Sequence, residues 1–311
     1  ISSHLPWQSE KWAKLVEQMN AQQLPHAILL SGVQFCGKAH FALALARLLL
    51  CAAPSAGHNC GECQACVLSQ SGSHGDFQTL EPEGTSRVIK VDQVRSLVEF
   101  TTKTASLGRR KVAILSPAES MHRSSANALL KSLEEPSPDT FIILVCHRLQ
   151  GLPATIRSRC QVINFLMPTP DQALPWLDQL TGARADSQNA LDLAGGRALL
   201  AASLYKEARL PDAEAVLASL EALGTGEGTV QDLGSLMADA PIEDLLQQLH
   251  RYLQGQIHTM DSRALTSGSG RRAFGLLDGV VQLQRVVASG ANPNRQLLLD
   301  SLSARFKMVL P

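Results

Sequence analysis

The stretch Ala27-Ile-Leu-Leu-Ser-Gly32-Val-Gln-Phe-Cys-Gly37-Lys38-Ala39 decides the fold class that we expect for this chain. It opens with a short apolar run of strand type, continues into a loop with two glycines, and leads into the apolar segment 41–50, which has the length of a helix. The spacing of the glycines and the lysine matches the G-x-x-x-x-G-K part of a phosphate-binding loop. An ordinary strand-to-helix turn that happens to hold two glycines is the alternative. The strand and helix on either side favour descent from a phosphate loop.

Two features of a working nucleotide site are missing. In a phosphate loop, backbone N–H groups surround the phosphate oxygens, the lysine neutralises their charge, and a final Ser or Thr hydroxyl binds Mg²⁺. Ala39 stands where that hydroxyl belongs. The strand expected at 111–115 is followed by Ser116-Pro117, where an ATPase needs an Asp for the metal and a Glu to activate water. The residues that would still contact a phosphate in this degenerate cofactor site are Gly32, Gly37 and Lys38.

Glu119 is the carboxylate that follows this second site. It lies past the place of the catalytic acid, in the opening turn of the next expected helix, and we interpret it as a helix N-terminal charge. With both magnesium ligands and the base missing, most of the electrostatic stabilisation of phosphoryl transfer is lost. We therefore expect no ATP hydrolysis by this chain, while nucleotide or phosphate binding through Lys38 stays open.

Strands and helices alternate along the first half of the sequence. We predict strands at 26–31, 77–80, 111–115 and 140–146 and helices at 41–50, 91–102 and 118–134. An alternation of this kind indicates an α/β fold, with a parallel sheet covered by helices on both faces.

The pattern changes after Phe165. Pro168 and Pro170 mark a linker, and no strand-like run follows them. Two short helices fit between 171 and 205, where Gly195-Gly196 separates them, and the remainder is purely helical. A helical bundle is therefore expected at the end of the chain.

The charge balance excludes one class of function. There are 28 Lys and Arg residues and 28 Asp and Glu residues, so the net charge is zero. A protein that held nucleic acid mainly by its overall charge would be basic, although a local patch such as Arg109-Arg110-Lys111 is not excluded. Most such runs are solvated turns, since phosphate contacts need several cations that converge on one groove.

No segment predicts a membrane span or export. The longest apolar run, 41–53, contains Arg47 and falls short of the roughly 18 residues that a membrane helix needs. Residues 1–7 have neither a basic segment nor an apolar core of the kind that directs export. We therefore expect a cytoplasmic protein.

Four of the seven cysteines have the spacing of a metal site. Cys51, Cys60, Cys63 and Cys66 follow the pattern C-x₈-C-x₂-C-x₂-C, in which neighbouring thiolates converge on one tetrahedral Zn²⁺. A reducing compartment disfavours disulfides, and an iron–sulfur cluster is the rival interpretation. Four thiolates leave no open position on the ion, so we expect one structural zinc. The other cysteines, expected to be small apolar fillers, are Cys36, Cys146 and Cys160.

Two further motifs bring a family into view. The segment Asn127-Ala-Leu-Leu-Lys131-Ser-Leu-Glu134-Glu135-Pro136 and the later Ser158-Arg159-Cys160 closely resemble the NALLK-LEEP and SRC motifs of the clamp-loader branch of the AAA+ ATPases. The phosphate loop, the cysteine cluster and both motifs fall in the family's order over residues 1–165. Because Ala39 and Ser116-Pro117 depart from the active members, the chain resembles a ring subunit that does not hydrolyse ATP.

The resemblance implies a three-part architecture and a role in DNA replication. The implied AAA+ fold has a RecA-like domain at 1–166 with a zinc module at 51–66, a helical lid domain at 167–208, and a helical-bundle collar domain for oligomerisation at 209–311. The family works as a five-member ring, in which γ/τ ATPase subunits and a δ subunit load the β sliding clamp onto primer–template DNA. That ring is part of the DNA polymerase III holoenzyme, but we expect neither ATPase nor polymerase activity from this chain itself.

Arg159 is the residue for which the resemblance implies a catalytic contribution. In the family, the arginine of the SRC motif, which here also contains Ser158, acts in trans at the ATP site of a neighbouring γ/τ subunit. An arginine that reaches the γ-phosphate stabilises the charge that develops there and accelerates the reaction roughly 10³–10⁵-fold. The alternative is a structural ion pair between helix and strand.

Two other positions differ from the active family members or have no assigned role. Cys146-His147 stands where active subunits carry a polar Thr pair that senses the γ-phosphate, so we do not expect sensing. Arg197 follows Gly195-Gly196, near the place where the family's lid presents a second sensor arginine, and it receives no role here.

Two other functions remain open from the sequence. The first is an active ATPase of γ/τ type, which Ala39, Ser116 and Pro117 disfavour. The second is an isolated zinc-ribbon protein that reads DNA without partners.

Overall fold

The computed structural model describes residues 2–84, 86, 88–207, 213–238, 242–288 and 293–309. The chain divides into two compact units, residues 1–176 and 177–311. The boundary expected between lid and collar, at 208, lies outside the described residues, and the three-part division stays a prediction.

The first unit contains a five-stranded, fully parallel sheet. Its strands are β1 (Ala27–Gly32), β2 (Phe77–Leu80), β3 (Lys111–Leu115), β4 (Thr140–Cys146) and β5 (Gln161–Phe165). The spatial order is β2-β3-β4-β1-β5, so β1 lies between β4 and β5. In this register Leu30 of β1 lies beside Val145 and Ile163. The four predicted strands are confirmed, and β5 adds a fifth.

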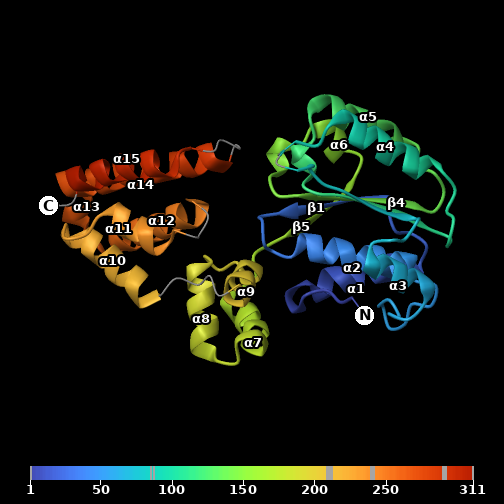
Figure 1. Ribbon diagram of the computed structural model, residues 1–311, viewed down its shortest axis with the longest axis horizontal. Helices are drawn as coiled ribbons and strands as arrows, with labels where there is room; N and C mark the ends of the chain where they lie inside the picture. The colour runs from blue at the N-terminus through green and yellow to red at the C-terminus, as the bar shows by residue number, and fades with distance from the viewer. Residues whose placement is uncertain are drawn as a thin grey trace. The chain divides into compact units, whose positions relative to one another are not determined.

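Helices cover both faces of this sheet, as expected for an α/β fold (Figure 1). They are η1 (Pro6–Gln8), α1 (Ser9–Asn20), α2 (Lys38–Leu50), α3 (Gln64–Ser71), α4 (Val91–Thr102), η2 (Ala118–Ser120), α5 (Arg123–Glu134), η3 (Leu149–Gly151) and α6 (Ala154–Arg157). Alternate residues of β1 face opposite sides: Ile28 and Leu30 pack in a core with α1 and α2, and Ala27 and Leu29 pack in a core with α4 and α5. The sheet is therefore buried on both faces, which explains why its strands are continuous apolar runs.

The helix expected at 118–134 is interrupted. Residues 118–120 form the 3₁₀ turn η2, and α5 begins only at Arg123. Between them Met121 is extended and forms a β-bridge with Ile89, whose N–H donates to the carbonyl oxygen of Ser120 at 2.8 Å. This pairing with a distant segment breaks the helical pattern that the local sequence favours.

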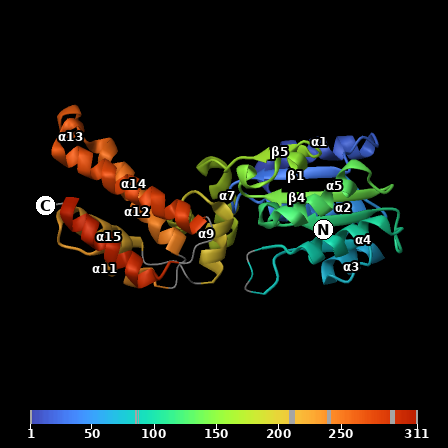
Figure 2. The ribbon, with the colours of Figure 1, turned by 90° about the horizontal axis from the view of Figure 1, so that it is seen from above.

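The second unit is helical in all its described secondary structure, as predicted. Together with α7 (Pro170–Thr181), which crosses the division between the units, the helices are α8 (Arg184–Leu193), α9 (Ala198–Lys206), α10 (Ala213–Thr225), α11 (Val230–Leu236), α12 (Ile242–Thr259), α13 (Ser262–Thr266), α14 (Gly268–Ala288) and α15 (Arg295–Val309). Helix α12 packs along α14, and α11 packs along α15 (Figure 2). Their shared core is built mainly from Leu and Val side chains.

The prediction of two helices between 171 and 205 is wrong, because three are present. Gly182, at a φ of 79°, separates α7 from α8, in addition to the expected break at Gly195-Gly196. Within the described parts of the chain, no helix combines the length and the apolar character that crossing a bilayer requires.

Candidate functional site

Lys38 lies just past the carboxyl end of β1, where nucleotides bind in parallel α/β sheets. Its Nζ donates to the carbonyl oxygens of Gly32 at 2.7 Å and Val33 at 2.6 Å, and lies 3.5 Å from Sγ of Cys36. The side chain is buried, and burial lowers its pKa. Gly32 itself packs closely against the backbone of β5. A Cβ at this position would lie 2.2 Å from the carbonyl oxygen of Phe165, so no larger residue fits. The ammonium group is therefore directed onto its own loop, and a phosphate would have to draw it away from two backbone acceptors.

The residues ahead of α1 pack against this loop. The side chains of Trp7 and Gln8 both donate to the carbonyl oxygen of Cys36, at 3.4 and 3.2 Å. Gly37 has a φ of 94°, and a Cβ at this position would lie 2.5 Å from both Leu5 and Gln8. Glycine is thus required by the backbone conformation and by the close approach. Nothing in the local motif indicates this contact, because its partners lie about 30 residues earlier in the chain.

Glu119 lies in the first turn of a helix, as expected, but its carboxylate contacts the backbone just past β4. It belongs to η2 rather than to the first turn of α5. Its Oε1 accepts the backbone N–H groups of His147 at 3.0 Å and Arg148 at 3.2 Å. The carboxylate therefore fixes the chain at the end of β4, which is a structural role. The sequence does not indicate this contact, because the two partners lie just past the end of β4, 28 and 29 residues later in the chain.

Cys146 is the last residue of β4, and His147 follows it. Cys146 is fully buried, and its burial together with the nearby Glu119 carboxylate raises the pKa of the thiol to about 12. Burial lowers the pKa of His147, with Lys38 as the next cause. Both groups are therefore uncharged at neutral pH, and Cys146 behaves as an apolar filler. Cys160 is similar, since burial raises its pKa to about 12.

The four clustered cysteines converge on one point in space. The Sγ atom of Cys51 lies 3.6 Å from that of Cys60 and 3.9 Å from that of Cys63, and Cys60 lies 3.9 Å from Cys66. All four sulfurs lie within 4.8 Å of one another. A tetrahedral ion with bonds near 2.3 Å separates its sulfurs by about 3.8 Å, so these residues fit a single metal ion. None of the four is in a disulfide.

Backbone amides support the same arrangement. The N–H of Cys60 donates to Sγ of Cys51 at 3.2 Å, and the N–H of Cys63 donates to Sγ of Cys60 at 3.3 Å. The side chain of Asn59 donates to Sγ of Cys66 at 3.3 Å. Donors of this kind stabilise thiolate ligands. The cluster connects the end of α2 to α3, a helix that we had not expected from the sequence.

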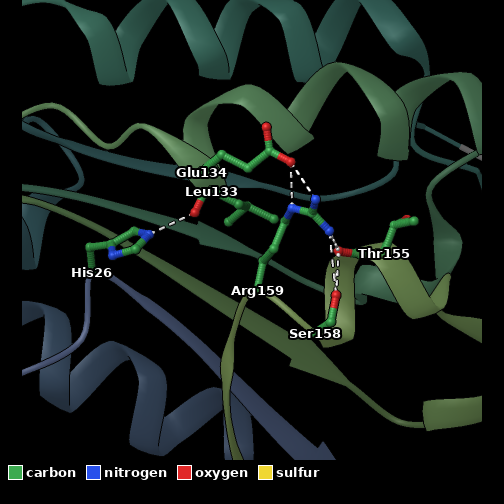
Figure 3. A network of polar contacts seen from close by, with 6 residues as sticks. All are labelled: His26, Leu133, Glu134, Thr155, Ser158 and Arg159. Carbon is green, nitrogen blue, oxygen red and sulfur yellow. Dashed lines mark hydrogen bonds and ion pairs between the residues drawn. The ribbon is translucent and has the colours of Figure 1, made fainter.

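Arg159 makes a dense set of contacts within its own chain (Figure 3). Its Nε donates to Oε1 of Glu134 at 2.6 Å, and its Nη2 pairs with the same oxygen. Its Nη1 donates to the carbonyl oxygen of Thr155 at 3.0 Å and lies 3.4 Å from Oγ of Ser158. The ion pair that the alternative interpretation required is therefore present. The Arg159 side chain nevertheless remains 35% exposed.

Arg197 is held inside the second unit. Its Nη2 pairs with Oδ1 of Asp244 on α12 at 2.9 Å, and its Nε donates to the carbonyl oxygen of Ala194 at 2.7 Å. Two further side chains of α12, those of Gln248 and Arg251, donate to the carbonyl oxygen of Leu193. Arg197 thus belongs to a polar contact between the α8–α9 turn and α12.

The basic run Arg109-Arg110-Lys111 does not present three cations to one surface. Lys111 is buried, and its Nζ donates to the carbonyl oxygen of Phe100 at 2.9 Å. The Arg110 guanidinium lies 6.0 Å from the centre of the Phe141 ring. Arg109 is exposed and lines a groove of about 960 Å³. The run is thus divided between packing and solvent.

A parallel sheet in the order β2-β3-β4-β1-β5, with a loop that contains Gly32, Gly37 and Lys38 after β1 and helices after β5, defines the chain as a protein of the AAA+ fold class. A family model described as DNA polymerase III, delta subunit, matches residues 7–169. The chain belongs to the DNA polymerase III subunit delta' family.

Similar proteins agree with this assignment. The chain is 36% identical to DNA polymerase III subunit delta' of Pseudomonas aeruginosa, over 96% of its own length and 95% of that protein. It is 31% identical to DNA polymerase III subunit delta' of Escherichia coli K12, over 98% and 96% of the two chains. Among solved structures, a gamma subunit-related protein of DNA polymerase III from Thermotoga maritima shares the fold, with a TM-score of 0.55, 21% identity, and coverage of 95% and 99%. The resemblance to the clamp-loader branch and the expected fold class are confirmed.

Proposed function

We propose that this chain is the subunit of a DNA polymerase III clamp loader that does not hydrolyse ATP. The observation that carries this proposal is the position of Lys38, whose ammonium group is held by two carbonyl oxygens of its own loop. The sequence also supports the absence of hydrolysis, because Ala39 and Ser116-Pro117 supply no side-chain ligand of the kind that holds Mg²⁺ in an active subunit. These features favour the proposal over a self-sufficient ATPase of γ/τ type.

The catalytic contribution of the chain is assigned to Arg159. Its guanidinium is partly exposed, next to Ser158 in a motif that resembles that of arginine-donating subunits. An arginine presented to the ATP of a neighbouring γ/τ subunit would stabilise charge on the γ-phosphate without any nucleotide in this chain. ATP-driven loading of the sliding clamp onto primed DNA would then depend on contact between subunits.

The cysteine cluster is assigned to one structural zinc ion. Four thiolates are the usual ligand set of structural zinc sites, and the sulfur separations of 3.6–3.9 Å suit tetrahedral coordination. Zinc would join the end of α2 to α3 and has no position left for a substrate.

The proposed function is tested by assembling the complex from its subunits. The chain is mixed with γ/τ and δ subunits, and complex formation is followed by size-exclusion chromatography. The purified complex is then assayed for loading of the β clamp onto primed DNA. We expect a stable complex and ATP-dependent loading, both absent when this chain is omitted. Failure to assemble, or ATP hydrolysis by the chain alone at the rate of an active subunit, would contradict the proposal.

A further inference from the structure

Glu134 is the acidic residue that faces the guanidinium of Arg159. It is the last residue of α5, and its Oε1 accepts from both Nε and Nη2 of Arg159. A carboxylate at a helix C-terminus is electrostatically unfavourable for the helix itself. The position of Glu134 is therefore not explained by the stability of α5, and the contact with Arg159 offsets its charge.

The contact uses the edge of Arg159 that matters for phosphate recognition. Arginine binds carboxylates and phosphates through pairs of N–H groups, and the Nε–Nη2 pair forms one such edge. Here that edge is occupied by Glu134, while Nη1 donates to the carbonyl oxygen of Thr155. A phosphate that approaches through the Nε–Nη2 edge must displace the carboxylate.

The strength of the pair suits reversible displacement. The side chains of Arg159 and Glu134 are 35% and 48% exposed, so water screens their attraction. Ion pairs of this kind bias an equilibrium by a factor of about 1.4 to 5. A phosphate carries more charge than one carboxylate and has more acceptor oxygens, so it competes effectively for the same donors.

We propose that Glu134 is a positioning residue that holds Arg159 on its own chain and competes for it with the γ-phosphate of a neighbour's nucleotide. The proposal rests on the function proposed above for Arg159. Before contact with ATP, Glu134 occupies the Nε–Nη2 edge. When the phosphate arrives, the guanidinium exchanges one anionic partner for another. The apparent affinity for the nucleotide is then the intrinsic affinity multiplied by the fraction of subunits in which Arg159 is not paired with Glu134.

The first test uses the free chain and needs no ATPase. Phenylglyoxal modifies accessible guanidinium groups, and the rate at Arg159 is followed by peptide mass spectrometry. We expect Glu134→Gln to raise that rate about 1.4- to 5-fold, because the charged partner is lost. Glu135→Gln is the matched control: it makes the same change at the next residue, for which the described residues contain no ion pair, and should leave the rate unchanged. An equal rate in the wild-type chain and Glu134→Gln would overturn the proposal.

The second test uses the reconstituted complex. Glu134→Gln should lower the KM for ATP by a similar factor and leave kcat unchanged, because competition is removed while Arg159 stays in place. A fall in kcat instead would overturn competition by Glu134. Arg159→Ala separates the two proposals: if it leaves turnover unchanged, the finger assignment fails, whereas a loss of turnover in Arg159→Ala with no KM change in Glu134→Gln rejects only the role of Glu134.

Discussion

The Nζ atom of Lys38 donates to the carbonyl oxygen of Gly32 at 2.7 Å, inside the loop that would hold phosphate in a working ATPase. The charge that should neutralise a nucleotide is thus engaged by the protein's own backbone. The next residue, Ala39, has no hydroxyl for a metal ion. Both observations support the proposal that this chain does not hydrolyse ATP.

Lys38 is expected to be structural. Lys38→Met should lower the free energy of unfolding by about 2 kcal/mol, because two carbonyl oxygens lose a charged donor. Urea denaturation measures this change, and the exposed Lys14→Met, expected to stay within about 0.5 kcal/mol, is the control. The turnover of the reconstituted complex should not change. Hydrolysis of Mg–ATP by the free chain that disappears in Lys38→Met would contradict this expectation.

The cysteine cluster should contain close to one zinc ion per chain, measured by elemental analysis. Cys63→Ser should remove most of the metal and lower the Tm, because the binding free energy of a structural ion is part of the folding free energy. Cys160→Ser, outside the cluster, should retain the metal. A folded, metal-free chain with four titratable thiols would reject the assignment.

Asp76 should make the stability of the first unit pH-dependent. The carboxylate is fully buried and accepts backbone N–H groups from Ser106, Leu107 and Gly108 at 2.7–3.2 Å. Burial alone would raise the pKa of Asp76, but the N–H groups of Ser106 and Leu107 outweigh it, so the pKa lies below its ordinary value of 3.8.

The sign of the effect follows from this lowered pKa. The stability contribution is complete at pH values above 3.8, and it is lost as the pH falls through the folded-state pKa, where the carboxylate becomes protonated. Asp76→Asn should cost about 3 kcal/mol at pH 7, and the difference from the wild-type chain should shrink in acid. Denaturant unfolding at several pH values measures it. A difference that does not depend on pH would show that the charge of Asp76 is not responsible.

Arg197 should stabilise the second unit through Asp244. The side chains of this pair are 17% and 7% exposed, so Arg197→Met would leave a buried carboxylate without its partner, at a cost of about 3–5 kcal/mol. The double variant Arg197→Met/Asp244→Leu, which removes both charges, should restore part of the lost stability. The exposed pair of Arg184 and Asp178 is the control, where Arg184→Met should cost less than about 1 kcal/mol. Equal effects of Arg197→Met and Arg184→Met in denaturant unfolding would contradict the structural role of Arg197.

The sequence predicted those parts of the fold that depend on local pattern. The strands around Leu30 and Val112 are continuous apolar runs because both faces of the sheet are covered, and this signal is visible without a structure. The cysteine spacing likewise predicted a cluster whose sulfurs do converge. The helix break at Met121 and the role of Glu119 were missed, since both depend on partners more than 25 residues away in the sequence.

The nucleotide and arginine sites show the same limit. Ala39 shows from the sequence alone that the hydroxyl ligand for a metal ion is absent at this position. The direction of the Lys38 side chain and the pairing of Arg159 with Glu134 follow from tertiary packing, which no motif encodes. In the sequence, the LEEP motif indicates only the family, and the structure identifies Glu134 as the glutamate that contacts Arg159.

The ATPase rate of a complex that contains Arg159→Ala is the most direct measurement of the central claim. It is compared with a complex that contains Arg157→Ala, which removes an arginine from the end of α6, two residues earlier. We expect both complexes to assemble, and only Arg159→Ala to lower DNA-stimulated turnover, by up to roughly 10³–10⁵ at the adjoining γ/τ site. Unchanged turnover in an intact Arg159→Ala complex would contradict the claim that this chain donates an arginine to its neighbour.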